Sequence, residues 1–135
     1  MAANDPQVIQ AAIYALGKIG PTAKETVPIL LKLNQSEDEL LRMTSVWAIL
    51  KIGPRTDELV KASIPILSSA LKNPREFVRV EAAMTLGDLG PPAAEAMPAL
   101  QSAATDLSAA VRSAADAAIK KIKGPATEVR SASKG

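Results

Sequence analysis

The sequence contains no cysteine and no histidine. These two absences exclude disulfide bonds, thiolate nucleophiles and imidazole ligands for a metal ion. Aromatic residues make up only 2% of the chain, with one Trp, one Tyr and one Phe, although 47% of the residues are hydrophobic. The core must therefore be built from aliphatic side chains, which is typical of short, closely packed helices.

The sequence also has no large excess of positive or negative charge. The chain has 16 basic and 14 acidic residues, so its net charge of +2 predicts no strongly anionic partner. The sequence contains no run of 18 apolar residues, which is about the length needed to span a membrane. The N-terminal residues also lack the pattern of a secretory signal. Because the chain begins almost at a helix cap, Asn4-Asp5-Pro6, we expect it to be a fragment of a longer protein. The compartment stays open, with the cytoplasm as the default.

The dipeptide Gly-Pro recurs at intervals of 33, 37 and 34 residues. Glycine tolerates a positive φ after the last turn of a helix and proline cannot continue that helix, so each pair predicts a helix end. Extra residues between Gly53 and Pro65 account for the longest interval, and they are expected to lengthen a helix that begins near Thr56 or Asp57. The four pairs start at Gly20, Gly53, Gly90 and Gly124.

One apolar pattern at helical spacing precedes each Gly-Pro pair. A helical hairpin of this kind cannot bury both of its faces alone, so fourfold self-similarity predicts a solenoid of stacked hairpins. Each set is expected to form the buried stripe of one helix. The sets are Val8, Ala12, Leu16 and Ile19; Leu41, Ser45, Ile49 and Ile52; Val78, Ala82, Leu86 and Leu89; and Val111, Ala115, Ile119 and Ile122.

Helix starts can be predicted as well. Asn73 and Pro74 match a cap followed by a proline in the first turn, and Ser36 with Glu39 matches a capping box. Together with the Gly-Pro ends, these signals predict helices near residues 6–19, 22–34, 38–52, 57–72, 75–89, 92–105 and 108–122.

Three segments, LRMTSVWAILKIGP, VRVEAAMTLGDLGP and ALGKIGPTAKETVPIL, resemble the short class of HEAT repeat that also occurs in phycobilisome-lyase-like proteins. The resemblance covers roughly residues 5–124. It implies an all-α, right-handed α-solenoid of about three and a half hairpins. One domain is expected over residues 1–123, followed by a flexible basic tail over 124–135. The signatures of tetratricopeptide and ankyrin repeats are absent.

In that family an acidic residue before the first helix of a repeat pairs with an arginine inside it, forming a ladder between neighbouring repeats. The matching positions here lie six residues apart, and only the last pair keeps the acidic member. The ladder is expected to be structural and to weaken toward the N-terminus, where Asn73 and Ser36 replace the carboxylate. Its members are Arg42, Arg79, Asp106 and Arg112.

No catalytic arrangement is recognisable in the sequence. There is no G-x-S-x-G elbow, phosphate loop or dinucleotide fingerprint, and no metal or cofactor is expected. The resemblance implies a non-catalytic scaffold whose partner is another protein, a second copy, or another part of a parent protein. A nucleic-acid-binding repeat module and a lyase-like enzyme accessory subunit are the alternatives. Nucleic acid is disfavoured because basic residues are few on the second helices.

Two surfaces are candidate protein-binding sites. An apolar outer stripe is expected on the first helices of the central repeats, opposite the core, with Trp47 as the anchor because Trp is enriched among binding hot spots. The alternative, that repeat packing buries this face, stays open. The second surface is a ridge of exposed positions along the second helices. The stripe comprises Leu40, Met43, Trp47, Phe77, Val80 and Met84; the ridge comprises Lys32, Gln35, Ser68, Ser69, Lys72, Gln101, Ser102 and Thr105.

Overall fold

The computed structural model describes residues 5–124, and every regular element in that range is a helix. The chain divides into two compact units at Val60, within a helix that begins in the first unit and continues in the second. In order, the helices are α1 (Pro6–Ile19), η2 (Gly20–Thr26), α2 (Val27–Leu33), α3 (Glu39–Ile52), α4 (Asp57–Ala70), α5 (Glu76–Leu89), η3 (Pro91–Ala96), α6 (Met97–Ala103) and α7 (Ala109–Lys123).

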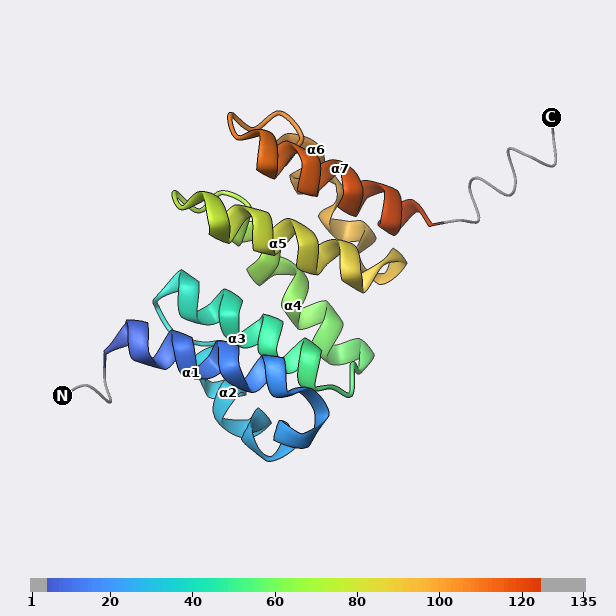
Figure 1. The fold of residues 1–135 in the computed structure, drawn as a ribbon. Helices are drawn as coiled ribbons and strands as arrows, with labels where there is room; N and C mark the ends of the chain where they lie inside the picture. Colours follow the sequence, from blue (N-terminus) through green and yellow to red (C-terminus); the bar gives the residue numbers. More distant parts are fainter. Residues whose placement is uncertain (1–4, 125–135) are drawn as a thin grey trace. The chain divides into compact units, whose positions relative to one another are not determined.

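The first unit is built around α3. Helix α1 lies along α3, and the η2–α2 segment packs against α3 (Figure 1). Leu59, at the start of α4, also packs onto the core of this unit. That core is entirely aliphatic, as the scarcity of aromatic residues predicted. Its buried members are Ile13, Ala23, Leu30, Leu41, Ala48, Ile49 and Ile52.

The second unit repeats this plan with α5 and α7 as the paired first helices. Helices α6 and η3 pack against α7, and η3 also contacts α5 (Figure 1). The expected stripe of α5 is buried, because Val78, Ala82 and Leu86 have no exposed surface and Leu89 has only 8%. The all-α class of tandem helical hairpins is therefore confirmed. The tail over 125–135 lies outside the described residues, and the single-domain expectation stays a prediction.

The Gly-Pro pairs end the first helices as expected. Each glycine has a positive φ between 70° and 79°, a conformation that residues with a Cβ rarely adopt. Each also donates its amide to a carbonyl of the last helical turn, as Gly53 does to Ile49 at 2.8 Å. The Gly-Pro pairs therefore mark the C-terminal ends of α1, α3, α5 and α7.

Two helix starts differ from the prediction. Asn73 does not cap α5; it accepts a hydrogen bond from the Arg75 amide at 2.9 Å, and the helix begins at Glu76. Ser36 likewise accepts from the Asp38 amide, and Asp38 caps α3 instead. Short polar side chains can bond to a backbone amide two residues later, which forms a turn before the helix rather than its cap.

The second helices are less regular than predicted. In the first and third repeats, a 3₁₀ segment occupies the first half and α-helix begins only at Val27 and Met97. Pro28 and Pro98 stand in the first turn of these α segments, where a missing amide costs nothing. The insertion in the second repeat gives a different result, because α4 is continuous from Asp57 and contains its proline internally.

The expected stripe of α1 is wrong. Val8 is 48% and Ile19 is 58% exposed, whereas Ile13, which was not assigned to the stripe, is 2% exposed. Helix α1 turns Ile13 and Gly17 toward α3, because the only first helix packed on it in its own unit lies on that side. The sequence frame is the same in all four repeats, but the neighbours of the helix are not.

Close contact between first helices depends on glycine. A Cβ added to Gly17 would collide with the ring of Trp47, and one added to Gly87 would lie 2.9 Å from the Cα of Ala118. Both positions are too close for van der Waals contact. The contact of α1 with α3 therefore requires a small residue at Gly17, and the contact of α5 with α7 requires one at Gly87.

Replacing Gly17 with Ala should displace the ring of Trp47. Alanine gains roughly 1 kcal/mol in helix propensity, but overpacking costs about 1–3 kcal/mol, so stability should fall or stay level. Because Trp47 is the only tryptophan, its fluorescence emission should shift to longer wavelength in the folded variant. Gly87→Ala, in the other unit, is the matched control: it should lower stability without changing the emission. An unchanged spectrum for Gly17→Ala would contradict the packing described.

Leu86→Ala should lower the free energy of unfolding by ~2–5 kcal/mol, because Leu86 is fully buried and leaves a cavity. Ile119→Ala on α7 should cost less, since Ile119 is only half-buried. Urea titrations followed by circular dichroism measure both values. Equal losses would show that α7 is packed as tightly at Ile119 as α5 is at Leu86.

Candidate protein-binding site

The N-terminal half of the predicted outer stripe is not an exposed surface. Met43 is only 3% exposed. Trp47 is half-buried, with its ring stacked on Tyr14 at a centroid distance of 4.9 Å and an interplanar angle of 7°. Leu40 is also half-buried. The expectation that Met43 and Trp47 point away from the core is therefore wrong.

The reason lies in the surroundings of α3. Four consecutive residues, Met43 to Val46, are buried, and together they cover a full turn of the helix. Where a whole turn of a helix is buried, an apolar residue opposite the stripe is a core residue rather than a surface residue. The helical-wheel argument assumed one buried face for each first helix, and α3 has more than one.

The C-terminal half of the stripe does lie at the surface. Phe77 and Met84 on α5 are 49% and 51% exposed, and Val80 between them is half-buried. The spacing of three and then four residues places the three side chains in one row along the helix. Their role in binding stays a prediction.

Most of the predicted ridge on the second helices is accessible. In the first unit Lys32 and Gln35 are exposed. In the second unit Ser68 is half-buried, and the remaining ridge residues are exposed, namely Ser69, Lys72, Gln101, Ser102 and Thr105. Of these, Lys72 and Ser102 face one open pocket.

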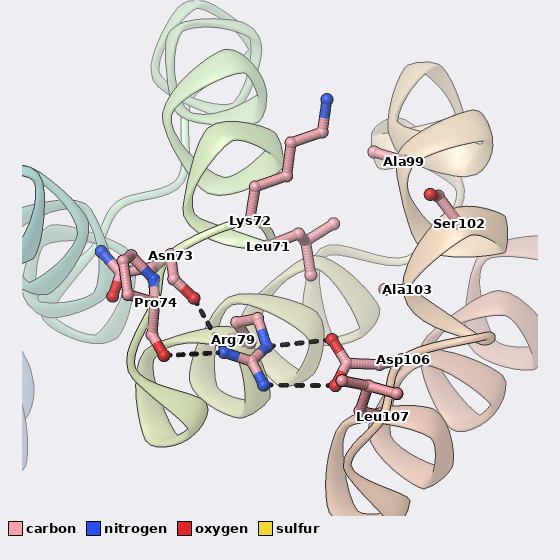
Figure 2. A pocket seen from close by; sticks show the side chains of 10 residues that line it. All are labelled: Leu71, Lys72, Asn73, Pro74, Arg79, Ala99, Ser102, Ala103, Asp106 and Leu107. Atoms are coloured by element: carbon pink, nitrogen blue, oxygen red, sulfur yellow. Dashed lines mark hydrogen bonds and ion pairs between the residues drawn. The ribbon is translucent and has the colours of Figure 1, made fainter.

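This pocket has a volume of about 370 Å³ and lies between the end of α4 and helix α6 (Figure 2). Lys72 extends from the end of α4 along one wall, and Ala99 and Ser102 line the facing wall on α6 (Figure 2). The loops before α5 and α7 complete the lining. The residues are Leu71, Lys72, Asn73, Pro74, Arg79, Ala99, Ser102, Ala103, Asp106 and Leu107.

Arg79 and Asp106 join the two loops at one end of this pocket. The guanidinium of Arg79 donates from Nε and Nη2 to the two carboxylate oxygens of Asp106, at 2.9 and 3.2 Å. Its Nη1 donates to the carbonyls of Asn73 and Pro74, at 2.9 and 3.0 Å (Figure 2). A bidentate, charge-assisted pair of this kind fixes orientation as well as distance. It therefore holds the loop before α5 against the loop before α7.

The other two arginines of the predicted ladder make the same local contact. Arg42 donates to the carbonyl of Ser36 at 2.5 Å, and Arg112 donates to the carbonyl of Asp106 at 2.6 Å. In all three repeats the acceptor lies six residues before the arginine, which is the spacing seen in the sequence. The arginine thus ties the first helix of a repeat to the loop that precedes it.

The pKa of Asp106 is lowered, and hydrogen bonding is the main cause. Its carboxylate accepts from the Ser108 amide at 2.8 Å and from Arg79, and the charges of Arg79 and Arg112 add to the effect. These interactions stabilise the ionised form and outweigh the opposing effect of burial. The carboxyl group of Asp106 is therefore ionised at neutral pH and forms an ion pair with the guanidinium of Arg79.

Leu107 is the most exposed of the pocket residues that the sequence analysis did not assign to a site; the others include Leu71, Ala99 and Ala103. The side chain of Leu107 is fully exposed, at 100%, although it lines the pocket. It lies in the loop between α6 and α7, where helical periodicity carries no information. The only indication in the sequence was that an apolar residue, Leu107, directly follows Asp106 of the predicted ladder.

A sequence model of the family described as HEAT repeats matches residues 1–77 and 64–130 of this chain. The chain is a HEAT-repeat protein. The expected recognition is thereby confirmed at the level of the family, whose members are generally protein-interaction scaffolds. No curated protein matches the chain significantly.

The HEAT repeats of this chain carry neither of two other kinds of site in the part that the structure describes. Residues 5–124 contain no helix that is long and apolar enough to cross a membrane. Over the same range, no three acidic side chains gather closely enough to hold a metal ion.

Asp106→Asn should destabilise the protein at neutral pH and matter less in acid. Because the folded pKa lies below the unfolded one, the ionised carboxylate stabilises the fold above about pH 4, and this contribution is lost as the pH falls through the lowered value. The melting temperature of Asp106→Asn should therefore lie below that of the natural chain at pH 7, and the two melting temperatures should become similar below pH 3. Asp116→Asn, an exposed change on α7, is the control. A constant difference at both pH values would contradict an ionic role.

Proposed function

We propose that this protein is a non-catalytic scaffold that binds a segment of another protein in the pocket between α4 and α6. The observation that carries the proposal is the pocket itself. It combines accessible apolar and polar side chains on the surface formed by successive second helices. Membership of the HEAT family supports the general role, since these repeats are typically protein-interaction scaffolds.

The lining predicts the chemistry of the bound segment. Leu107 and the half-buried Ala99 offer accessible surface for an aliphatic side chain, over a floor that includes the buried Leu71 and Ala103. Lys72 brings an ammonium group to the same pocket, and Ser102 a hydroxyl. A pocket of about 370 Å³ lies at the small end of the range for ligand sites. It therefore suits one or two side chains of an extended peptide that carries a carboxylate next to an aliphatic residue.

The charge arrangement argues against a nucleic acid as the occupant of this pocket. Two basic side chains line it, and one of them, Arg79, is already paired with Asp106. Lys72 alone would supply too little positive charge for a phosphate backbone, whose binding depends on several neutralised phosphates. A single cation suits a single carboxylate.

A library of random peptides displayed on phage tests this proposal. Peptides selected on the natural chain should be enriched in an acidic residue beside an aliphatic one. Ser102→Tyr places a ring against the pocket and should weaken their binding by about tenfold or more. The matched control is Ser113→Tyr, which changes an exposed serine on α7 that does not line the pocket.

A second pair of variants tests the charge. Lys72→Glu should abolish binding of the acidic peptides, whereas Lys61→Glu, on an exposed part of α4 away from the lining, should leave it intact. Fluorescence anisotropy with a labelled peptide measures each affinity. Selected peptides that bind the Ser102→Tyr and Lys72→Glu variants as well as the natural chain would overturn the proposal.

A further inference from the structure

A second apolar surface lies on the first unit and shares no residue with the pocket. Val8 and Ile19 on α1 are 48% and 58% exposed, and Ala12 and Ala15 between them are exposed as well. These four residues, Val8, Ala12, Ala15 and Ile19, are called the α1 face below.

The same positions are buried in the later repeats. Val111 and Ile122, which correspond to Val8 and Ile19, are 0% and 5% exposed. Ala118, which corresponds to Ala15, approaches α5 so closely that its Cα would lie 2.9 Å from a Cβ on Gly87. On α7 the positions that correspond to the α1 face are thus buried, and one of them, Ala118, packs directly against α5. The α1 face therefore has the composition of a helix-packing surface, but no other helix of the first unit covers it.

The spacing within the face is symmetric. Val8, Ala12, Ala15 and Ile19 are separated by four, three and four residues, with large side chains at the ends and small ones in the middle. If two such helices pack antiparallel, Val8 of one helix meets Ile19 of the other, and Ala12 meets Ala15. The large side chains then pair at the two ends of the contact, and the alanines allow the helices to approach closely in the middle. We propose that the α1 face binds a second copy of this chain, with the two α1 helices antiparallel about a twofold axis.

The charges at the ends of α1 fit this arrangement. Asp5 caps the N-terminal end, and Lys18 lies in the last turn, and both are exposed. An antiparallel pair brings the acidic end of each helix toward the basic end of the other. The helix dipoles are then opposed as well, which adds to the attraction. A parallel pair would place like charges together at both ends.

The opposite end of the repeat array does not match the α1 face. On α5, the side that receives α7 carries Ala83 and Gly87, both buried. The corresponding positions on α7 are Asp116 and Lys120, both exposed. Head-to-tail stacking would bury these two charged residues against an apolar surface, which is costly. A closed dimer through α1 is therefore favoured over an open filament.

Sedimentation equilibrium of the natural chain, at concentrations from about 1 μM to 1 mM, should show a monomer–dimer equilibrium, because a single helix pair is a small interface. Ala12→Arg should weaken the dimer by at least about tenfold, since it puts a guanidinium into the contact. Ala117→Arg, which changes an exposed alanine on α7, should dimerise like the natural chain. Circular dichroism should show both variants folded.

Cysteine variants then test the antiparallel geometry, because the chain has no cysteine of its own. In the proposed dimer, the two Val8 positions lie about 16 Å apart along the helices, from the rise per residue. A disulfide requires Cα atoms within about 7 Å. Neither Val8→Cys nor Ile19→Cys should therefore cross-link alone under mild oxidation, but an equal mixture of the two should. Met84→Cys, exposed on α5, should not cross-link with either variant.

Three outcomes would overturn the proposal. A chain that stays monomeric up to 1 mM would leave the α1 face to a different polypeptide. Open-ended assembly would indicate head-to-tail contacts, and cross-linking of Val8→Cys with itself would indicate a parallel pair. Loss of peptide binding in the pocket, by contrast, would bear only on the proposed function, because the α1 face shares no residue with it.

Discussion

The contact between successive first helices is the constraint on which each unit depends. A helical hairpin leaves one apolar face uncovered, and the next first helix covers it. The two helix axes can approach closely only where one helix carries a glycine. These glycines are Gly17, which faces Trp47, and Gly87, which faces Ala118. Because the two glycines occupy the same position in their repeats, one sequence feature produces the same packing in both units.

The ladder between Arg79 and Asp106 follows from that contact. Once α5 and α7 lie side by side, the loops before them are neighbours, and a six-residue spacing places arginine and carboxylate within reach. The pair then shapes the pocket, because its loops form part of the lining. A structural interaction of the repeat thus determines the geometry of a surface suited to binding.

Local chemistry predicted the helix ends correctly, although not the caps of α3 and α5, and predictions that depend on neighbouring helices failed. Gly-Pro pairs fixed the helix ends, since positive φ and a missing amide act within a few residues. The burial of Met43 and the exposure of Ile19 could not be read from periodicity, because they depend on which helices lie beside α3 and α1. The pocket escaped prediction for a similar reason: Leu107 lies in a loop, and its neighbours come from two hairpins.

The unequal ends of the repeat array also bear on how it could be lengthened by design. New hairpins added before α1 would meet Val8, Ala12, Ala15 and Ile19, a surface that already has the composition of an internal joint. Hairpins added after α7 would meet Asp116 and Lys120, so the joint would first have to be rebuilt with small residues like Ala83 and Gly87. An engineer extending the chain would therefore need fewer substitutions at the α1 face than at α7.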